Sequence, residues 1–259
     1  MSTITLPTHS LVGLLSDVSL TAGSDPEIPL LRTVLLHTDR GEVMTTTGRA
    51  EEEPLIDVVP SDLLIGTSTD GVSMISQAHT ACEGLFHRPL LISVPDVKAI
   101  VDVFKGKEVA TQTQLETTGD HLMVSEDPRL APGGVVVTVP VLDLLEDYPT
   151  HLPGLMQPDP HVVVEDGHGA VIDPSYGTGM DTTVFDVIAK VGKRRKMLPA
   201  WYRHHQRKGV VVEIGSMWRA LFMPSKLDED SGQHLGPQVR VFSPDLPVQR
   251  PSTPPLTVV

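Results

Sequence analysis

The chain has 259 residues and a mass of 28.0 kDa, enough for one large or two ordinary domains with a buried core. Its 40% hydrophobic and 20% charged residues are typical of a globular protein. The sequence lacks an apolar run of roughly 18 residues and does not start like a secretory signal, so we expect a cytoplasmic protein that makes no membrane contact. The single cysteine, Cys82, excludes an internal disulfide.

Periodicity predicts an α+β chain in which a strand, a helix and two strands occur three times in this order. The first occurrence has a strand at 2–7, a helix with Leu11, Leu14, Leu15 and Val18 on one face, and strands at 30–38 and 41–48 around a turn at Asp39, Arg40 and Gly41. The second has a strand at 89–94, a helix at 96–107, and strands at 109–117 and 121–126. The third has a strand at 169–176, a helix at 181–197, and strands at 209–216 and 218–225. Additional strands are predicted at 72–79, 133–141 and 238–242.

A polar, proline-rich stretch, LEDYPTHLPGLMQPDP, separates the second occurrence from the third and is typical of a linker. We therefore predict a first domain at 1–148, a linker at 149–160, a shorter second domain at 161–243 and an extended tail at 244–259. Repeated small antiparallel sheets, each covered by an amphipathic helix, have free edges that favour end-to-end association.

Positive charge is concentrated in one part of this acidic chain. The net charge is −13, yet residues 181–208 contain eight Lys and Arg against two Asp, a local balance of +6 that leaves −19 for the rest. In the helix predicted there, Val184, Val187, Ile188 and Val191 fall on one face, and the cations spread over the other. Cations at a helix C-terminus favour its dipole by about 0.3 to 1 kcal/mol each. The Lys and Arg residues of this segment are more numerous than the helix dipole requires. They therefore favour contact with phosphates, which does not depend on the base sequence.

Three stretches of the sequence resemble the sliding clamps of DNA replication, in particular the bacterial β clamp. Residues 9–49 resemble that family's first helix, hydrophobic strand and Thr-rich hairpin, although Thr47, Gly48 and Arg49 replace its common Thr-Asp. VVVTVPVLDLLEDYP resembles the strand and acidic turn that end its first domain, and MWRALFMPSKL resembles its closing strand. The chain has room for two domains where bacterial β clamps have three. The sequence pattern also predicts three helices, whereas two complete domains need four.

The resemblance implies a non-enzymatic processivity factor that encircles double-stranded DNA and tethers DNA polymerase and other proteins carrying clamp-binding peptides. It implies a ring of several copies, and a two-domain chain favours a trimer. The short chain and proline-rich tail suggest a divergent, phage-encoded version. The implied DNA-facing residues are Lys190, Lys193, Arg194, Arg195, Lys196, Arg203, Arg207 and Lys208, with Lys98, Lys105 and Lys107 as weaker candidates. The implied peptide pocket is lined by Met223, Pro224 and Leu227, although Met223 could equally end a core strand.

Two other functions fit the same residues: a clamp mimic that binds host replication proteins without encircling DNA, and a monomeric DNA-binding α+β module. Catalysis has less support, because none of the eleven histidines forms H-E-x-x-H and the single cysteine cannot supply a zinc-binding pair. Gly177 and Gly179 precede a helix but lack the third glycine of a dinucleotide-binding loop. We expect no enzyme activity, no metal and no cofactor.

Overall fold

The structure is a computed structural model of the whole chain. It describes residues 2–47, 55–71, 73–107, 111–126, 133–145, 148, 178–179, 182–203, 209–223 and 225–226. The predicted linker at 149–160, the strands at 169–176 and 238–242 and the tail at 244–259 lie outside these described residues. Of the helices that the structure describes, none is long and apolar enough to cross a membrane.

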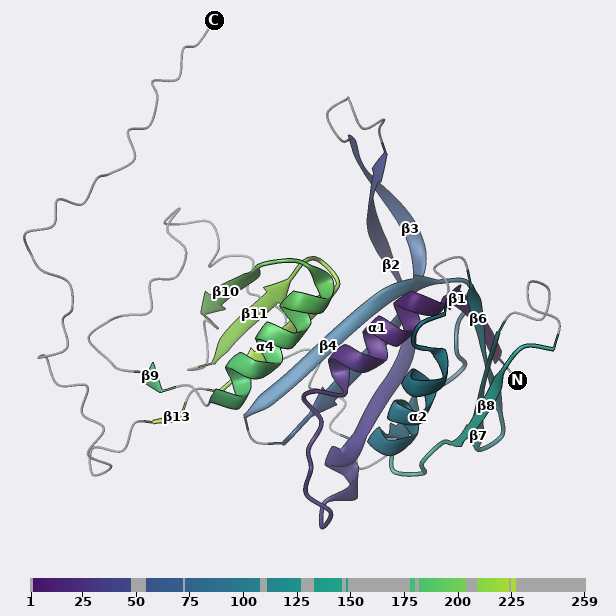
Figure 1. Cartoon of the computed structure of the whole chain (residues 1–259), viewed down its shortest axis with the longest axis horizontal. Coiled ribbons are helices and arrows are strands. Elements are labelled where there is room, and N and C mark those ends of the chain that lie inside the picture. The colour runs from purple at the N-terminus through teal and green to yellow at the C-terminus, as the bar shows by residue number, and fades with distance from the viewer. Residues whose placement is uncertain are drawn as a thin grey trace, which may run out of the picture.

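The first unit, residues 2–148, contains the arrangement β-α-β-β-β twice (Figure 1). The first repeat comprises β1 (Ser2–Pro7), α1 (Thr8–Val18), the 3-10 turn η1 (Pro29–Arg32), β2 (Thr33–Thr47), β3 (Leu55–Thr69) and β4 (Met74–Cys82). The second comprises β5 (Leu90–Ser93), α2 (Val94–Phe104), β6 (Gln112–Thr118), β7 (His121–Glu126) and β8 (Val136–Pro140). The predicted α+β class and both predicted helices are confirmed.

In the residues that the structure describes, the second unit contains one helix and a three-stranded meander: α4 (Thr182–Arg195), β10 (Pro199–Arg203), β11 (Val210–Ile214) and β12 (Trp218–Phe222). Beside it, the short strands β9 (Thr178–Gly179) and β13 (Ser225–Lys226) pair with each other. The two larger sheets have the strand orders β1-β6-β7-β8 and β10-β11-β12-β4-β3-β2-β5. Because β12 pairs with β4, one seven-stranded antiparallel sheet continues from the first unit into the second.

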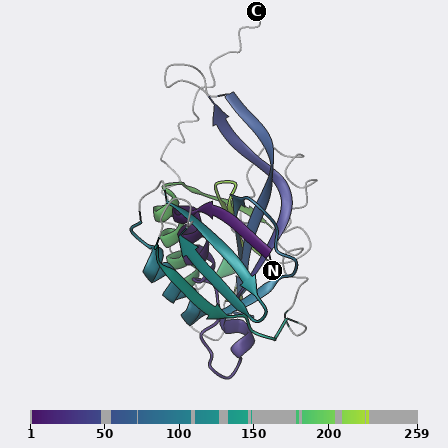
Figure 2. The ribbon, with the colours of Figure 1, turned by 90° about the vertical axis from the view of Figure 1, so that its right-hand side faces the viewer.

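The three α-helices of the described residues, α1, α2 and α4, lie on the same side of this seven-stranded sheet (Figures 1 and 2). Apolar residues from α1, α2, α4 and the strands form one continuous core cluster. The apolar face predicted for the third helix is confirmed, since its four aliphatic residues, Val184, Val187, Ile188 and Val191, are all buried. The opposite sheet face at β2 and β5 is covered separately by the segment around Tyr148, which packs on Leu35 and Leu91.

The predicted turn at Asp39, Arg40 and Gly41 is wrong. These residues lie inside β2, where they pair with Leu63, Asp62 and Ser61 of β3, a strand that the sequence analysis missed. A Cβ on Gly41 would lie 2.6 Å from Cδ1 of Leu63, so this glycine accommodates a neighbouring side chain instead of a chain reversal. The paired β2 and β3 extend as a twisted ribbon beyond the rest of the sheet (Figure 2).

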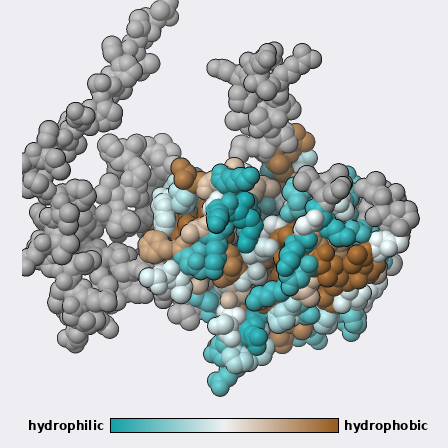
Figure 3. All heavy atoms as spheres, in the orientation of Figure 1, coloured by the Kyte–Doolittle hydropathy of each residue, from teal (hydrophilic) through white to brown (hydrophobic). Residues whose placement is uncertain are grey.

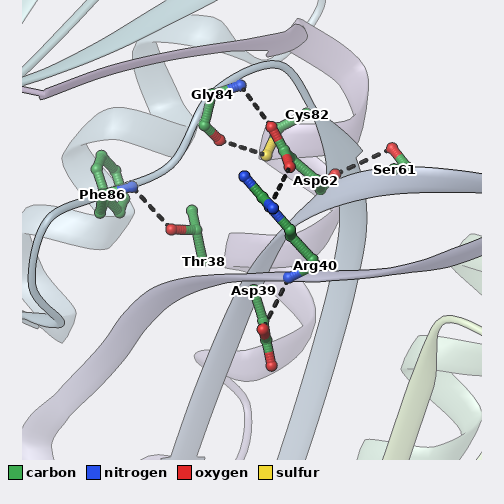
Figure 4. A network of polar contacts seen from close by, with 8 residues as sticks. All are labelled: Thr38, Asp39, Arg40, Ser61, Asp62, Cys82, Gly84 and Phe86. Atoms are coloured by element: carbon green, nitrogen blue, oxygen red, sulfur yellow. Dashed lines mark hydrogen bonds and ion pairs between the residues drawn. The ribbon is translucent and has the colours of Figure 1, made fainter.

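Polar contacts join the base of this ribbon to the loop after β4 (Figure 4). The Gly84 amide donates to Oδ2 of Asp62 at 3.1 Å, and the Phe86 amide donates to Oγ1 of Thr38 at 2.7 Å. Asp62 also faces the guanidinium of Arg40 at 4.0 Å. The same loop pairs with β1 at Glu83, so it connects the two sheets of the first unit.

Gly84 is expected to be irreplaceable, because it combines a φ of +97° with a close backbone approach: a Cβ there would lie 2.5 Å from the Thr3 carbonyl oxygen. We expect Gly84→Ala to lower the free energy of unfolding by about 3 kcal/mol or more. The matched control is Gly119→Ala, with a φ of +60° and no atom within 4 Å of the new methyl group. The control should lose only about 1 kcal/mol, the cost of the left-handed backbone. Urea denaturation of both variants measures the difference, and equal losses would show that the close approach is harmless.

Candidate nucleic-acid interface

The basic helix α4 presents its cations in different directions. Lys193 is exposed and lies opposite the buried aliphatic face, so it points away from the sheet. Lys190 is also exposed but contacts Asp186 one turn earlier, with Nζ 2.5 Å from Oδ2. Hydrophilic residues cover α4 on the face seen in Figure 3.

Arg194 and Arg195 contact a buried carboxylate on the neighbouring helix. Nε of Arg195 lies 2.8 Å from Oδ2 of Asp17, and Arg194 pairs with the other carboxylate oxygen. The Asp17 side chain is 1% exposed, against 38% for Arg194 and 19% for Arg195. Burial raises the pKa of the Asp17 carboxyl, and the two guanidinium groups oppose that rise. These two arginines therefore join α4 to α1, a role that the sequence analysis did not predict for them.

Two helix ends meet at this ion pair. Asp17 lies in the last turn of α1, and both arginines lie in the last turn of α4. Carbonyl groups make each C-terminal end partially negative, so two cations placed between the ends stabilise both helices. The sequence carried a signal that Asp17 has a partner but did not identify it, because Asp17 stands between Leu14, Leu15 and Val18 of an apolar periodic pattern, where a charge needs a partner.

Lys196 ends α4 in the left-handed conformation, with a φ of +54°. The amide of Met197 donates to the Gly192 carbonyl oxygen at 3.1 Å, which is the hydrogen bond of a Schellman cap. Glycine is the usual residue at such a position. The side chain of Lys196 is exposed, and its backbone adopts a conformation that is strained for a lysine.

Of the three weaker candidates for contact with DNA, which lie in or after α2, two form ion pairs. Lys105 pairs with Asp102, and Lys107 contacts Glu126 of β7 at 2.9 Å. Lys98 is exposed. In the described part of the chain, Lys98, Lys193 and Lys196 are thus the predicted DNA-facing cations that form no ion pair. Helix α1, which lies between α2 and α4, has no Lys or Arg.

The three remaining predicted cations lie wholly or partly outside the described residues. Arg207 and Lys208 lie outside the described residues. Of Arg203 only the backbone is described, at the end of β10.

The predicted peptide pocket is only partly described. Met223 follows β12, is 40% exposed, and donates its amide hydrogen to the Ser73 carbonyl at 2.9 Å. Nearby, on the sheet face away from the helices, Val211 and Leu221 form a small apolar cluster. Pro224 and Leu227 lie outside the described residues. In the parts of the chain that are described, no group of three or more His, Cys, Asp or Glu could hold a metal ion.

Removing the two arginines should destabilise the fold more than removing their partner does. In the double variant Arg194→Ala, Arg195→Ala, the buried Asp17 carboxylate loses both cations, and we expect a loss of about 3 to 5 kcal/mol at neutral pH. Asp17→Asn should cost less, because both guanidinium groups are partly exposed and can be solvated. Urea denaturation measures both losses.

The deficit of the double variant should also shrink as the pH falls. The raised pKa means that the folded state favours neutral Asp17, so the cost of ionising Asp17 is absent below its unfolded pKa and builds up as the pH rises from the unfolded pKa through the folded pKa. A deficit that stays constant down to acidic pH, or an equal loss in Asp17→Asn, would contradict this account.

Replacing Lys196 by glycine should stabilise the protein. We expect Lys196→Gly to raise the free energy of unfolding by about 0.5 to 1 kcal/mol, because glycine adopts the left-handed cap without strain. The matched control, Lys193→Gly, makes the same chemical change inside α4 and should instead cost about 1 kcal/mol. Thermal unfolding of the two variants gives the sign, and a loss in both would show that the cap is not strained.

Comparisons with known proteins agree with this geometry. No protein-family model and no curated protein matches the chain. Among solved structures, the DNA polymerase III β subunit of Thermotoga maritima matches with a TM-score of 0.55 and 14% identity, over 88% of this chain and 66% of that one. The β subunit of Pseudomonas aeruginosa matches with a TM-score of 0.57 and 9% identity, over 87% of this chain and 67% of that one.

The Caulobacter crescentus β sliding clamp matches with a TM-score of 0.56 and 10% identity, over 87% of this chain and 66% of that one. The chain thus spans slightly less than two thirds of the Thermotoga and Caulobacter proteins. At identities of 9 to 14%, these matches show the fold of the chain. The chain has the fold of the bacterial DNA polymerase III β sliding clamps, at low sequence identity.

Proposed function

We propose that this protein is a sliding-clamp-like processivity factor, which encircles duplex DNA as a homo-oligomer and tethers a DNA polymerase and other proteins with clamp-binding peptides. The observation that carries the proposal is geometric: two units share one continuous sheet, and α1, α2 and α4 all lie on one side of it. In a ring built from such pieces, the helices would line the hole and the sheets would form the outside. A trimer remains the favoured ring size for a chain of this length.

The charges of the helix side support weak, sliding contact with DNA. Lys98, Lys193 and Lys196 are exposed on or beside the helices, while the other predicted cations that are described with side chains form ion pairs. A lysine ammonium group contacts a phosphate without recognising a base. Few such contacts give low affinity, and a clamp that must move along DNA needs low affinity.

A specific observation also favours the clamp mimic. Helix α1 has no Lys or Arg, and the net charge of the chain is −13. An acidic surface of this kind repels the phosphate backbone unless the cations are well placed. A mimic that binds host replication proteins would keep the clamp fold and make no contact with DNA.

Charge variants of the helix side separate these functions. The three lysines that form no ion pair within the described residues should contribute about −2.7 per chain to the slope of log K against log salt for binding to a short duplex. Lys193→Glu and Lys196→Gly should each reduce the magnitude of this slope by about 1 and lower affinity about tenfold near 0.1 M salt. Fluorescence anisotropy with a labelled duplex measures both quantities.

The matched control for these variants is Arg40→Glu, which reverses a charge that is 83% exposed on the β2–β3 ribbon, away from the helices. It should leave DNA binding within about twofold of the parent, as expected for a group that makes no phosphate contact. Because Lys196→Gly should stabilise the fold, unfolding cannot explain its weaker binding. Unchanged affinity in Lys193→Glu would exclude the helix side as the DNA contact.

Topology distinguishes encirclement from binding to a surface patch. A closed ring assembled around a nicked circular DNA should stay on the circle in high salt and be lost once the circle is cut. A monomeric DNA-binding module would dissociate from both forms at the same salt concentration, and a mimic would bind neither. Gel filtration of the protein with circular and linear DNA, followed by protein detection, measures the retention.

A further inference from the structure

Two aromatic side chains are exposed where α4 meets β10. Trp201 lies opposite the buried Val212 in the paired strands β10 and β11, so it faces the helix layer. There α4 brings Phe185 to it, with the ring centroids 6.2 Å apart and the ring planes inclined by 46°. Phe185 is 51% exposed and Trp201 is 36% exposed. The two rings therefore leave aromatic surface available to a ligand.

Small residues and cations continue from these rings along α4. Helical periodicity places Phe185, Ala189 and Gly192 in one line, and Lys196 follows where the helix ends. This line has no large side chain between Phe185 and Lys196. Lys193 is exposed beside it. Together these residues form a surface termed the aromatic flank: Phe185, Ala189, Gly192, Lys193, Lys196 and Trp201.

The aromatic flank is positively charged and lies at the margin of the second unit. In the described part of the chain, β10 is the outer strand of the seven-stranded sheet, and α1 and α2 lie on the other side of α4 (Figure 1). The sequence has a single acid among residues 182–203, Asp186, and it pairs with Lys190. Lys193 and Lys196 form no ion pair within the described residues. An anionic ligand is therefore favoured.

Exposed rings beside cations fit an unpaired nucleic-acid strand. Every nucleotide carries a base with a flat π-face and a negative phosphate, whereas a peptide offers both only in particular sequences. Lys193 lies about 12 Å along the helix from Phe185, at about 1.5 Å per residue. That distance equals about three to four nucleotides at about 3.4 Å each. In a duplex the base faces are covered by stacking, so duplex DNA contacts the lysines and not the rings.

We propose that the aromatic flank binds unpaired DNA, with bases stacked on Phe185 and Trp201 and phosphates against Lys193 and Lys196. The inference rests on the proposed function only in placing DNA on the helix side, and it adds a second kind of DNA there. A polymerase substrate contains a duplex and an unpaired template strand. A helix side that binds both would hold the protein at their junction.

Tryptophan fluorescence measures the stacking directly. The chain has two tryptophans, of which Trp218 is 1% exposed and Trp201 is 36% exposed. An oligothymidylate of about ten nucleotides should quench the emission of Trp201 and leave that of Trp218 unchanged. Trp201→Leu should abolish the quenching. An abasic deoxyribose-phosphate strand of the same length should bind at least about tenfold more weakly, because it has the charge but no base to stack.

Variants of Phe185 separate the aromatic ring from its bulk. Phe185→Leu keeps an apolar side chain and loses the π-face, so it should lower the affinity for oligothymidylate about fivefold or more. Phe185→Tyr keeps the ring and should bind within about twofold of the parent. The matched control is Val58→Ala, which changes a 54% exposed residue on the β2–β3 ribbon and should also leave binding unchanged. Fluorescence anisotropy with a labelled oligothymidylate measures all three variants.

Duplex binding by the same variants separates this inference from the proposed function. Phe185→Leu should bind a blunt duplex as tightly as the parent, because a duplex has no free base face. An equal loss for duplex and oligothymidylate, or equal binding of the abasic and thymidylate strands, would overturn the inference. Absence of quenching would also overturn it, and is the result expected if the flank binds a protein. Failure to encircle circular DNA would instead overturn the proposed function and leave stacking on the flank intact.

Discussion

The attachment of the second unit to the first is the constraint on which the rest of the structure depends. One half of that attachment is the pairing of β12 with β4, which fixes the register of the two units from Trp218 opposite Ala78 to Phe222 opposite Met74. The other half is the contact of Asp17 with Arg194 and Arg195 on the helix side. The sheet alone would allow the units to bend, because a single line of hydrogen bonds resists rotation about itself poorly. A contact in a second layer removes that freedom.

This attachment determines which charges remain for a partner. A segment with six cations between residues 190 and 203 looks like a uniform basic patch in the sequence. In three dimensions its two middle arginines neutralise a buried carboxylate, and a lysine pairs along the helix with Asp186. The positive charge left on the helix side is therefore smaller than the sequence indicates. For the proposed sliding ring a smaller positive charge would be an advantage, because every additional phosphate contact adds to the affinity for DNA.

The sequence predicted the elements whose signals are local and missed those that depend on distant partners. The apolar periods of α1, α2 and α4 predicted helices in the right places, since each period reports the face that must be buried. The long strand β2 was divided at Gly41, because glycine in a turn and glycine beneath a neighbouring Leu63 look the same in one dimension. The position of Asp17 opposite the arginines could not be read, since 177 residues separate Asp17 from Arg194. The resemblance to sliding clamps indicated how the elements are arranged in the whole chain, which the local patterns do not indicate.

The repeat structure of the fold explains where the described core is closed. In the first unit each repeat closes the other, and the residues of β2 that face the helices are fully buried. The sheet of the second unit continues into β4, and its helix α4 contacts α1. The first unit therefore covers the core of the second unit on that side. Its other side has no such partner within the described residues, and there the large apolar side chains of Phe185 and Trp201 are partly exposed. Burial of apolar surface drives folding, so the contacts with β4 and α1 are what hold the core of the second unit together on its closed side.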